Sequence, residues 1–278
     1  MIKKRIIFTL LLSEKNFILS RNFVHQKVGD INWLKKNYNF KSTSNFIDEL
    51  VIINVDKKRN YEEFFEVSKK IARDCFVPIT YGGGINNFNI ASTMFKNGAD
   101  KIIINSSTFK NPELLNQISS VYGSQSVIVS LDFKKEDKDE YSVWIENGKK
   151  KIEITLDHHL ENLMNYEFGE IYLNSIDKDG TGFGYDLSVM NKLKSISKKI
   201  PIIISGGAGN DNHFFEALKI NEIDAVSTAH LFNFVGDGLE KARKSLIEKK
   251  ISFPEWNADI IENHNNYFKN EKNYSTNS

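Results

Sequence analysis

The decapeptide PIIISGGAGN, residues 201–210, decides the fold. Its apolar run leads into Gly206, Gly207 and Gly209, a pattern typical of a buried strand that enters a turn. Residues 213–219 directly after it have helical character. Glycines in such a turn let backbone N–H groups approach an anion, and the N-terminus of a following helix favours negative charge. The stretch therefore fits either a phosphate site or a ligand-free strand-to-helix turn.

The same pattern occurs in the first half of the chain, in VPITYGGG at residues 77–84. Gly83 and Gly206 are 123 positions apart, and further apolar segments repeat at nearly the same spacing. These pairs are residues 5–11 with 126–132, 48–54 with 169–175, and 99–102 with 223–226. A duplicated unit of this length is half of an eight-stranded barrel. We therefore predict a single (β/α)8 TIM barrel made of two duplicated half-barrels over residues 1–250. The polar tail, residues 251–278, is expected to be partly disordered.

The periodicity of apolar residues places the individual elements along this barrel. A hairpin is expected over residues 141–155, turning at Asn147-Gly148, whereas the residues after the first strand, 22–24 included, are expected to form a polar loop. The strands are predicted at residues 5–12, 49–55, 78–81, 101–104, 127–132, 170–174, 201–205 and 224–227. Helices are predicted at residues 61–74, 88–97, 156–166 and 236–249, with a short one within 31–46.

Composition excludes several classes of function. The net charge of +1 gives no basic footprint for nucleic acid, and no apolar run reaches the roughly 18 residues that a membrane helix needs. The single cysteine, Cys75, excludes an internal disulfide and fits a reducing compartment, so we expect a cytoplasmic protein. His158 and His159 are interpreted as a solvated helix start because no third metal ligand lies at a suitable spacing. Neither a metal nor a cofactor is expected.

The active face of such a barrel is built from the loops that follow the C-terminal ends of its strands. Asp132 ends the fifth strand and is the candidate catalytic residue. The other candidates form two similar anion pockets, which fit either a ligand phosphorylated at both ends or one functional pocket beside an inherited shell. The predicted phosphate- or substrate-binding residues are Gly83, Gly84, Asn105, Ser106, Asp179, Gly180, Thr181, Ser205, Gly206, Gly207, Gly209, Thr228 and Ala229.

At about residues 3–250 the chain resembles the cyclase subunit of imidazole glycerol phosphate synthase, an ammonia-using barrel of histidine biosynthesis. Shared motifs include YGGGI at residues 81–85 and DKDGT at residues 177–181. The resemblance implies two aspartates, at the ends of strands one and five, that act as acid and base on a bisphosphorylated substrate. Asp132 occupies the second position, but Leu11 occupies the first, and the internal repeat aligns the same two residues.

The substitution at position 11 changes the expected chemistry. Leu11 has no proton to transfer, and losing such a group typically costs a factor of about 10²–10⁴ in rate. Leu19 and Ser20 stand where the family's mobile first loop carries Lys-Gly, and Asn54 stands where the family has an aspartate. These changes indicate a cyclase site that has been rebuilt or discarded.

Four charged residues, Arg5, Glu49, Lys101 and Glu170, each open a predicted strand and should point into the barrel at its N-terminal end. Buried charges are costly unless they are paired, so a closed ring is expected. The resemblance implies that these positions form a gate for ammonia from a bound glutaminase, and that Asp100 helps to dock this partner. The alternative is a structural salt-bridge plug.

Three hypotheses about function follow. In the first, the chain accepts ammonia from a glutaminase subunit and passes it to a phosphorylated acceptor. By analogy with relatives in surface-polysaccharide synthesis, the ammonia is then used to amidate a sugar, and a sugar amidotransferase is a further partner. In the second, the chain is an authentic histidine-pathway cyclase subunit with a substitute acid. In the third, it is a non-catalytic scaffold that binds a phosphorylated ligand.

Overall fold

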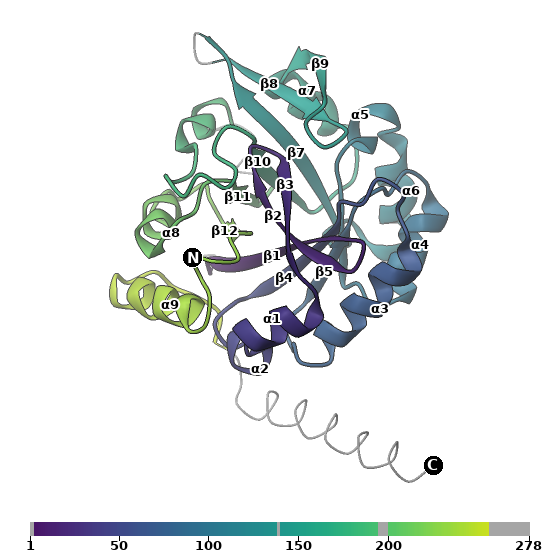
Figure 1. The fold of residues 1–278 in the computed structure, drawn as a ribbon. Helices are drawn as coiled ribbons and strands as arrows, with labels where there is room; N and C mark the ends of the chain where they lie inside the picture. The colour runs from purple at the N-terminus through teal and green to yellow at the C-terminus, as the bar shows by residue number, and fades with distance from the viewer. Residues whose placement is uncertain (1–2, 138–139, 194–199, 256–278) are drawn as a thin grey trace, which may run out of the picture.

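The computed structural model describes residues 3–137, 140–193 and 200–255, and these form a closed barrel of parallel strands surrounded by helices (Figure 1). β12 pairs with β1, and β10 pairs with both β7 and β11, so the eight strands close into a cylinder. The predicted TIM barrel is confirmed. The barrel strands are β1 (Arg5–Ser13), β4 (Glu49–Asn54), β5 (Ile79–Gly82), β6 (Lys101–Ile104), β7 (Val127–Lys135), β10 (Glu170–Ser175), β11 (Ile202–Ser205) and β12 (Ala225–Thr228).

The helices cover the outside of the barrel. Several of them are preceded by an asparagine, which is one of the preferred N-cap residues. The side chains of Asn60, Asn87 and Asn210 each accept a hydrogen bond from a backbone N–H in the first turn of the helix that follows. The α-helices are α1 (Ile31–Asn37), α2 (Phe40–Thr43), α3 (Tyr61–Ala72), α4 (Phe88–Lys96), α5 (Ser107–Lys110), α6 (Glu113–Tyr122), α7 (Leu156–Leu163), α8 (Asp211–Leu218) and α9 (Gly238–Glu248). Short 3₁₀ helices occupy Ser124–Ser126 (η1) and Leu187–Lys192 (η3).

Two β-hairpins extend β1 and β7 beyond the barrel. The hairpin of β8 (Tyr141–Ile145) and β9 (Lys150–Thr155) was predicted and is confirmed. The polar loop predicted after β1 is wrong, because β2 (Asn16–Arg21) and β3 (Val24–Gly29) form a hairpin there. Asn16 and Tyr141, which begin β2 and β8, are 125 positions apart, so the duplication includes the hairpins.

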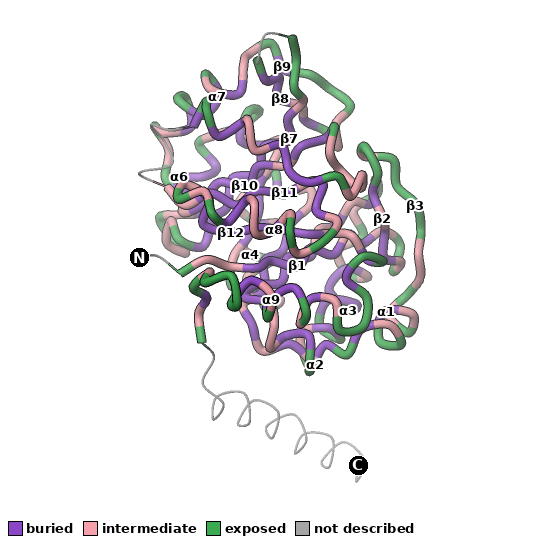
Figure 2. The backbone as a smooth tube through the Cα atoms, turned by 90° about the vertical axis from the view of Figure 1, so that its left-hand side faces the viewer, coloured by how far each residue is buried: buried purple, intermediate pink, exposed green. Residues whose placement is uncertain are grey.

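Side chains alternate between the inside and the outside of the barrel wall, as period-2 strands require. In β1, Ile6, Phe8 and Leu10 face the helices, whereas Ile7 belongs to a separate cluster inside the barrel. Figure 2 shows the buried barrel wall enclosed by elements that expose their outer sides. The inner cluster consists of Ile7, Val51, Ile103, Ile128, Tyr172, Ile203 and Ala225.

The chain after α9 returns to the floor of the barrel. Arg243 forms a buried ion pair with Asp48 (2.8 Å), whose carboxylate also accepts the backbone N–H of Ile6 (2.8 Å). Phe253 is buried beside the Arg243 guanidinium, so residues 251–255 pack on the barrel. The rest of the tail that was expected to be disordered lies outside the described residues. None of the described helices is long and apolar enough to cross a membrane.

Candidate functional site

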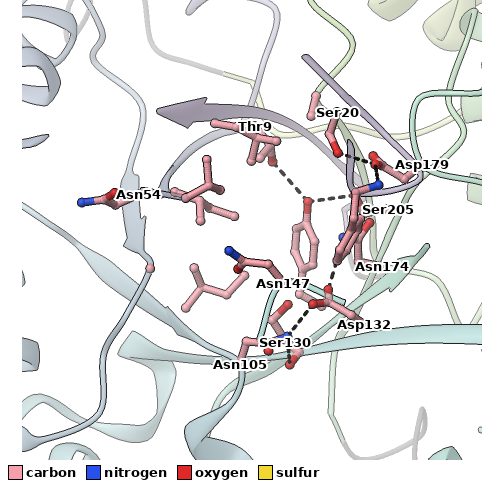
Figure 3. A pocket seen from close by; sticks show the side chains of 18 of the residues that line it. Thr9, Ser20, Asn54, Asn105, Ser130, Asp132, Asn147, Asn174, Asp179 and Ser205 are labelled. Carbon is pink, nitrogen blue, oxygen red and sulfur yellow. Dashed lines mark hydrogen bonds between the residues drawn. The ribbon is translucent and has the colours of Figure 1, made fainter. Parts of the chain in front are cut away.

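The C-terminal ends of the strands surround a cavity of about 550 Å³ (Figure 3). Two predicted site residues do not line it: the Thr181 hydroxyl donates to the Lys178 carbonyl (2.7 Å), and the Gly209 N–H donates to His213 Nδ1 (3.0 Å). Both groups are thus used within their own loops. The predicted residues that do line the cavity are Gly83, Gly84, Asn105, Ser106, Asp132, Asp179, Gly180, Ser205, Gly206, Gly207, Thr228 and Ala229.

Asp132 lies on β7 between two asparagines (Figure 3). The Asn105 amide donates to one carboxylate oxygen (3.0 Å) and the Asn174 amide donates to the other (3.3 Å). Burial raises the pKa of Asp132 to about 7, although both amide bonds act in the opposite direction. A base is most effective when its pKa lies near the working pH, so this carboxyl suits proton transfer.

Leu11 forms part of an apolar wall where the resemblance implies a second carboxyl. It is paired in register with Ile53, and both residues line the cavity together with Ile103. Among the described residues, the other carboxylates in the lining are Glu146 and Asp179, and both are engaged: Glu146 pairs with Lys110 at the exposed rim. No lining carboxylate therefore stands free in place of the missing acid.

Asp179 holds the tip of the β2–β3 hairpin over the cavity. Its carboxylate accepts bonds from the Ser20 hydroxyl (2.5 Å) and the Phe23 N–H (3.0 Å), and burial raises its pKa. Gly180 allows this approach, because a Cβ there would lie 2.0 Å from the Ser20 carbonyl oxygen. Asp179 and Gly180 both line the cavity, as predicted. The contacts described here, however, are with the β2–β3 hairpin.

The two glycine-rich turns face each other across the cavity mouth. Gly83 has φ +103°, and a Cβ there would lie 2.1 Å from the Asn54 carbonyl oxygen, so only glycine fits. Gly207 repeats this geometry against the Gly184 carbonyl oxygen (2.2 Å) in the second half. Cationic side chains that sequence reasoning missed also line the cavity: Lys57, Arg59, Lys110 and Lys149. The cavity thus combines two tight backbone turns with a basic rim, which suits an anionic ligand.

The opposite end of the barrel is closed by the four charged residues that open its strands. Arg5 and Lys101 each bind both Glu49 and Glu170, which gives a closed ring of four ion pairs. Burial alone would raise the pKa of Glu170, but Arg5 and Lys101 outweigh it and lower this pKa. Asp100 is exposed beside the ring and accepts the Ile79 N–H (2.8 Å). The ring has the predicted geometry, while its role as an ammonia gate and that of Asp100 in docking stay predictions.

Comparison with known proteins places the chain in a family. The family model described as "Histidine biosynthesis protein" matches residues 22–236, and the chain aligns over nearly its whole length with imidazole glycerol phosphate synthase subunits. This chain belongs to the HisF-like family. A protein of Parasynechococcus marenigrum (strain WH8102) named "Putative imidazole glycerol phosphate synthase subunit hisF2" is 43% identical over 92% of this chain and 95% of its own length. The HisF subunits of Dictyoglomus turgidum and Clostridium botulinum (strain 657 / Type Ba4) are each 36% identical, over 90% and 91% of this chain and 98% and 99% of their own lengths.

The HisF-like chain has a cluster of hydroxyl groups under the cavity that was not predicted. The Tyr172 hydroxyl donates to Ser205 Oγ (2.9 Å) and also contacts the hydroxyls of Thr9 (3.2 Å) and Ser227 (2.8 Å). The signal for Tyr172 was present in the sequence: it lies two residues after Glu170, which was predicted to point inward, and period-2 alternation gives both the same face.

The histidine interpretation of the HisF-like chain needs one correction. His158 is exposed as expected, but His159 is buried, with Nε2 3.3 Å from the Thr108 hydroxyl and Phe109 against its ring. Burial lowers the pKa of His159 to about 4, so it is a neutral core residue at neutral pH. Within the described residues no group of three or more His, Cys, Asp or Glu side chains is arranged to hold a metal.

Proposed function

We propose that this HisF-like chain is a synthase subunit that admits ammonia through the charged ring at its floor. The ammonia would react with a phosphorylated acceptor in the mouth cavity or leave through it. The observation that best supports this is that the charged ring and the cavity lie on the same barrel axis. The closed ring lies under a cavity whose lining includes Asp132, a buried carboxyl with a pKa near neutrality. A structural plug would account for the ring, but it gives no reason for a cavity with a buried carboxyl on the same axis.

The source of the ammonia in this proposal is a glutaminase subunit bound at the floor. Arg5 and Lys101 remain about one-fifth exposed there, so a partner could reach the ring, and Asp100 is exposed beside it. The relatives named as subunits of a synthase also support a partner. Free ammonia is scarce near neutral pH because most of it is protonated, and direct transfer from a docked enzyme would avoid this loss.

The acceptor is proposed to be the sugar of an amidation reaction in surface-polysaccharide synthesis, with a sugar amidotransferase as the downstream enzyme. Leu11 supports this choice over cyclisation, because the acid/base pair across the cavity is incomplete. A second candidate, the authentic cyclase of histidine biosynthesis, is favoured by the pKa of Asp132 and by the presence of both glycine turns.

Co-expression with a glutaminase subunit tests the first part of the proposal. A complex should form, and glutamine hydrolysis should be faster in the complex than with the glutaminase alone. Asp100→Lys should weaken the complex, while Asp237→Lys, which changes an exposed carboxylate on the α9 side, should leave it intact. Absence of both a complex and any stimulation would contradict the proposal and leave a ligand-binding scaffold.

Turnover of the bisphosphorylated cyclase substrate with added ammonium salt separates the two acceptors. Sugar amidation predicts negligible cyclisation by the unaltered chain and a gain of at least about tenfold in Leu11→Asp, because a proton-transfer group contributes about 10²–10⁴-fold. Leu11→Asn is the matched control, since it has the same shape but no acid. Efficient cyclisation by the unaltered chain would establish the authentic cyclase instead.

A further inference from the structure

The axis of the barrel is closed between the charged ring and the cavity. Interior positions stack in layers contributed by alternate strands. Above the ring come Ile7, Ile128 and Ile203, all 0% exposed, and none of them lines the cavity. A molecule of the size of water or ammonia therefore finds no open path from the ring to Asp132 in this structure.

Tyr172 stands at the boundary between the closed axis and the cavity. Its side chain belongs to the buried inner cluster and also lines the cavity, although it is only 3% exposed. It follows Glu170 on β10 as the next inward position, so it lies directly above a member of the ring. The Tyr172 side chain thus lies between the charged ring and the cavity.

The Tyr172 hydroxyl is held by three other strands. Thr9 on β1, Ser205 on β11 and Ser227 on β12 lie 3.2, 2.9 and 2.8 Å from it, and Thr9 and Ser227 are 2.8 Å from each other. Phenylalanine would fill the axis equally well. The hydroxyl therefore adds a set of bonds that holds the ring in one position, and these bonds can be broken without unfolding the barrel wall.

A polar group lies on the closed side of Tyr172. Thr80 on β5 is in register with Lys101 of the ring and with inward-facing Val51, and it is 1% exposed. Its hydroxyl has no hydrogen-bond partner among the described residues. A buried hydroxyl without a partner is unfavourable, and a small polar molecule passing the ring would satisfy it.

We propose that Tyr172 is an inner gate of the barrel. When the Tyr172 hydroxyl breaks its hydrogen bonds with Thr9, Ser205 and Ser227, the tyrosine side chain rotates away. The space around Thr80 then becomes continuous with the cavity. Ammonia as the molecule that crosses rests on the proposed function, but the gate itself is a property of this chain alone. The route would then have two barriers, the charged ring and the tyrosine.

Thiol labelling of the full chain tests the gate without a partner or an acceptor. Thr80→Cys places a thiol of similar size below Tyr172, and methyl methanethiosulfonate is a small neutral reagent that can enter from the cavity. The natural Cys75 is buried outside the barrel wall, so its labelling reports global unfolding in the same sample. Mass spectrometry of the two peptides gives both rates.

In the Thr80→Cys background, labelling at position 80 should be slow with Tyr172 and fast with Tyr172→Leu, which replaces the tyrosine ring with a smaller side chain. The decisive variant is Tyr172→Phe, which keeps the ring and removes the hydroxyl. A gate predicts labelling at least about tenfold faster than with Tyr172, because the bonds that hold the ring are lost. Thr9→Val should act in the same direction, while Tyr38→Phe, which removes a buried hydroxyl bond off the axis to the Leu231 carbonyl, should not.

Three results would overturn the gate. Rapid labelling with Tyr172 intact would show that the axis is already open. Equal rates for Tyr172 and Tyr172→Phe would make the ring a passive filler, and parallel labelling of Cys75 would make the opening global unfolding. Failure of the glutaminase to bind would refute the proposed function but would leave these rates unchanged, so the two proposals fail separately.

Discussion

Asp132→Asn should change how the stability of the protein depends on pH. The folded-state pKa of about 7 exceeds the value of about 3.9 for an unfolded aspartate, because burial penalises the charged form. The protonated form therefore favours folding: this contribution is fully present below about pH 4 and is lost as the pH rises through 7. About three pH units at about 1.4 kcal/mol each make the loss about 4 kcal/mol.

Urea unfolding followed by tryptophan fluorescence at pH 4, 5, 6, 7 and 8 measures this effect. The free energy of unfolding of Asp132→Asn, minus that of the unaltered chain, should increase by about 4 kcal/mol from pH 4 to pH 8 and then level off. Other titrating groups are common to both proteins and cancel in the difference. A constant offset from altered bonds with Asn105 and Asn174 does not affect the slope.

Asp211→Asn is the control with the opposite sign. Its carboxylate accepts the Ser245 hydroxyl (2.6 Å), which lowers its pKa, so its ionised form stabilises the folded state and this stability is lost as the pH falls. This loss occurs below about pH 4, so the control series runs at pH 2, 3, 4 and 5: the same difference should decrease with rising pH there and stay flat from pH 5 to pH 8. A flat difference for Asp132→Asn, or the same sign for both variants, would refute the account of Asp132 as a buried carboxyl of raised pKa.

Three further predictions concern the fold. Arg243→Ala should lower the free energy of unfolding by about 3–5 kcal/mol, because it leaves Asp48 buried without its ion-pair partner; urea denaturation measures this, and a loss below about 1 kcal/mol would contradict it. Gly83→Ala should cost at least about 2 kcal/mol more than Gly98→Ala, since both have φ above +100° but only Gly83 has backbone within 2.1 Å; thermal denaturation decides, and equal losses would exclude the steric explanation. Burial of neutral His159 contributes stability that is fully present above about pH 6.5 and is lost as the pH falls to 4, so the free energy of unfolding of His159→Leu, minus that of the unaltered chain, should rise as the pH falls through this range; urea denaturation measures it, and a flat difference would contradict the account.

The barrel could be predicted because the two halves of the sequence repeat the same pattern of strands. Residues 77–84 and 201–210 gave the same strand-and-glycine pattern, and the spacing between them gave the size of the repeated unit. The hairpin after β1 was missed because residues 22–24 show no Asn-Gly turn signal like that at Asn147-Gly148. Applying the repeat to the confirmed hairpin of the second half would have found it.

The candidate site was predicted less completely than the fold. Asp132 reaches the cavity because it lies on β7 itself, and both glycine turns reach it because they directly follow the ends of β5 and β11. Thr181 and Gly209 do not, because each lies further along its loop, where local hydrogen bonds decide the direction of the backbone. Tyr172 was not predicted because it lies inside β10, whereas the site residues were sought in the loops that follow the strands.

The two halves of the barrel contribute different charges to the ring at its floor. Arg5, Glu49 and Lys101 come from the first half, whereas Glu170 alone comes from the second. Two copies of the first half would bring together four cations and two carboxylates, and two copies of the second would bring only carboxylates. Neither homodimer could be neutral at its centre, so the unlike halves select each other, and severed halves expressed together should assemble only as the mixed pair.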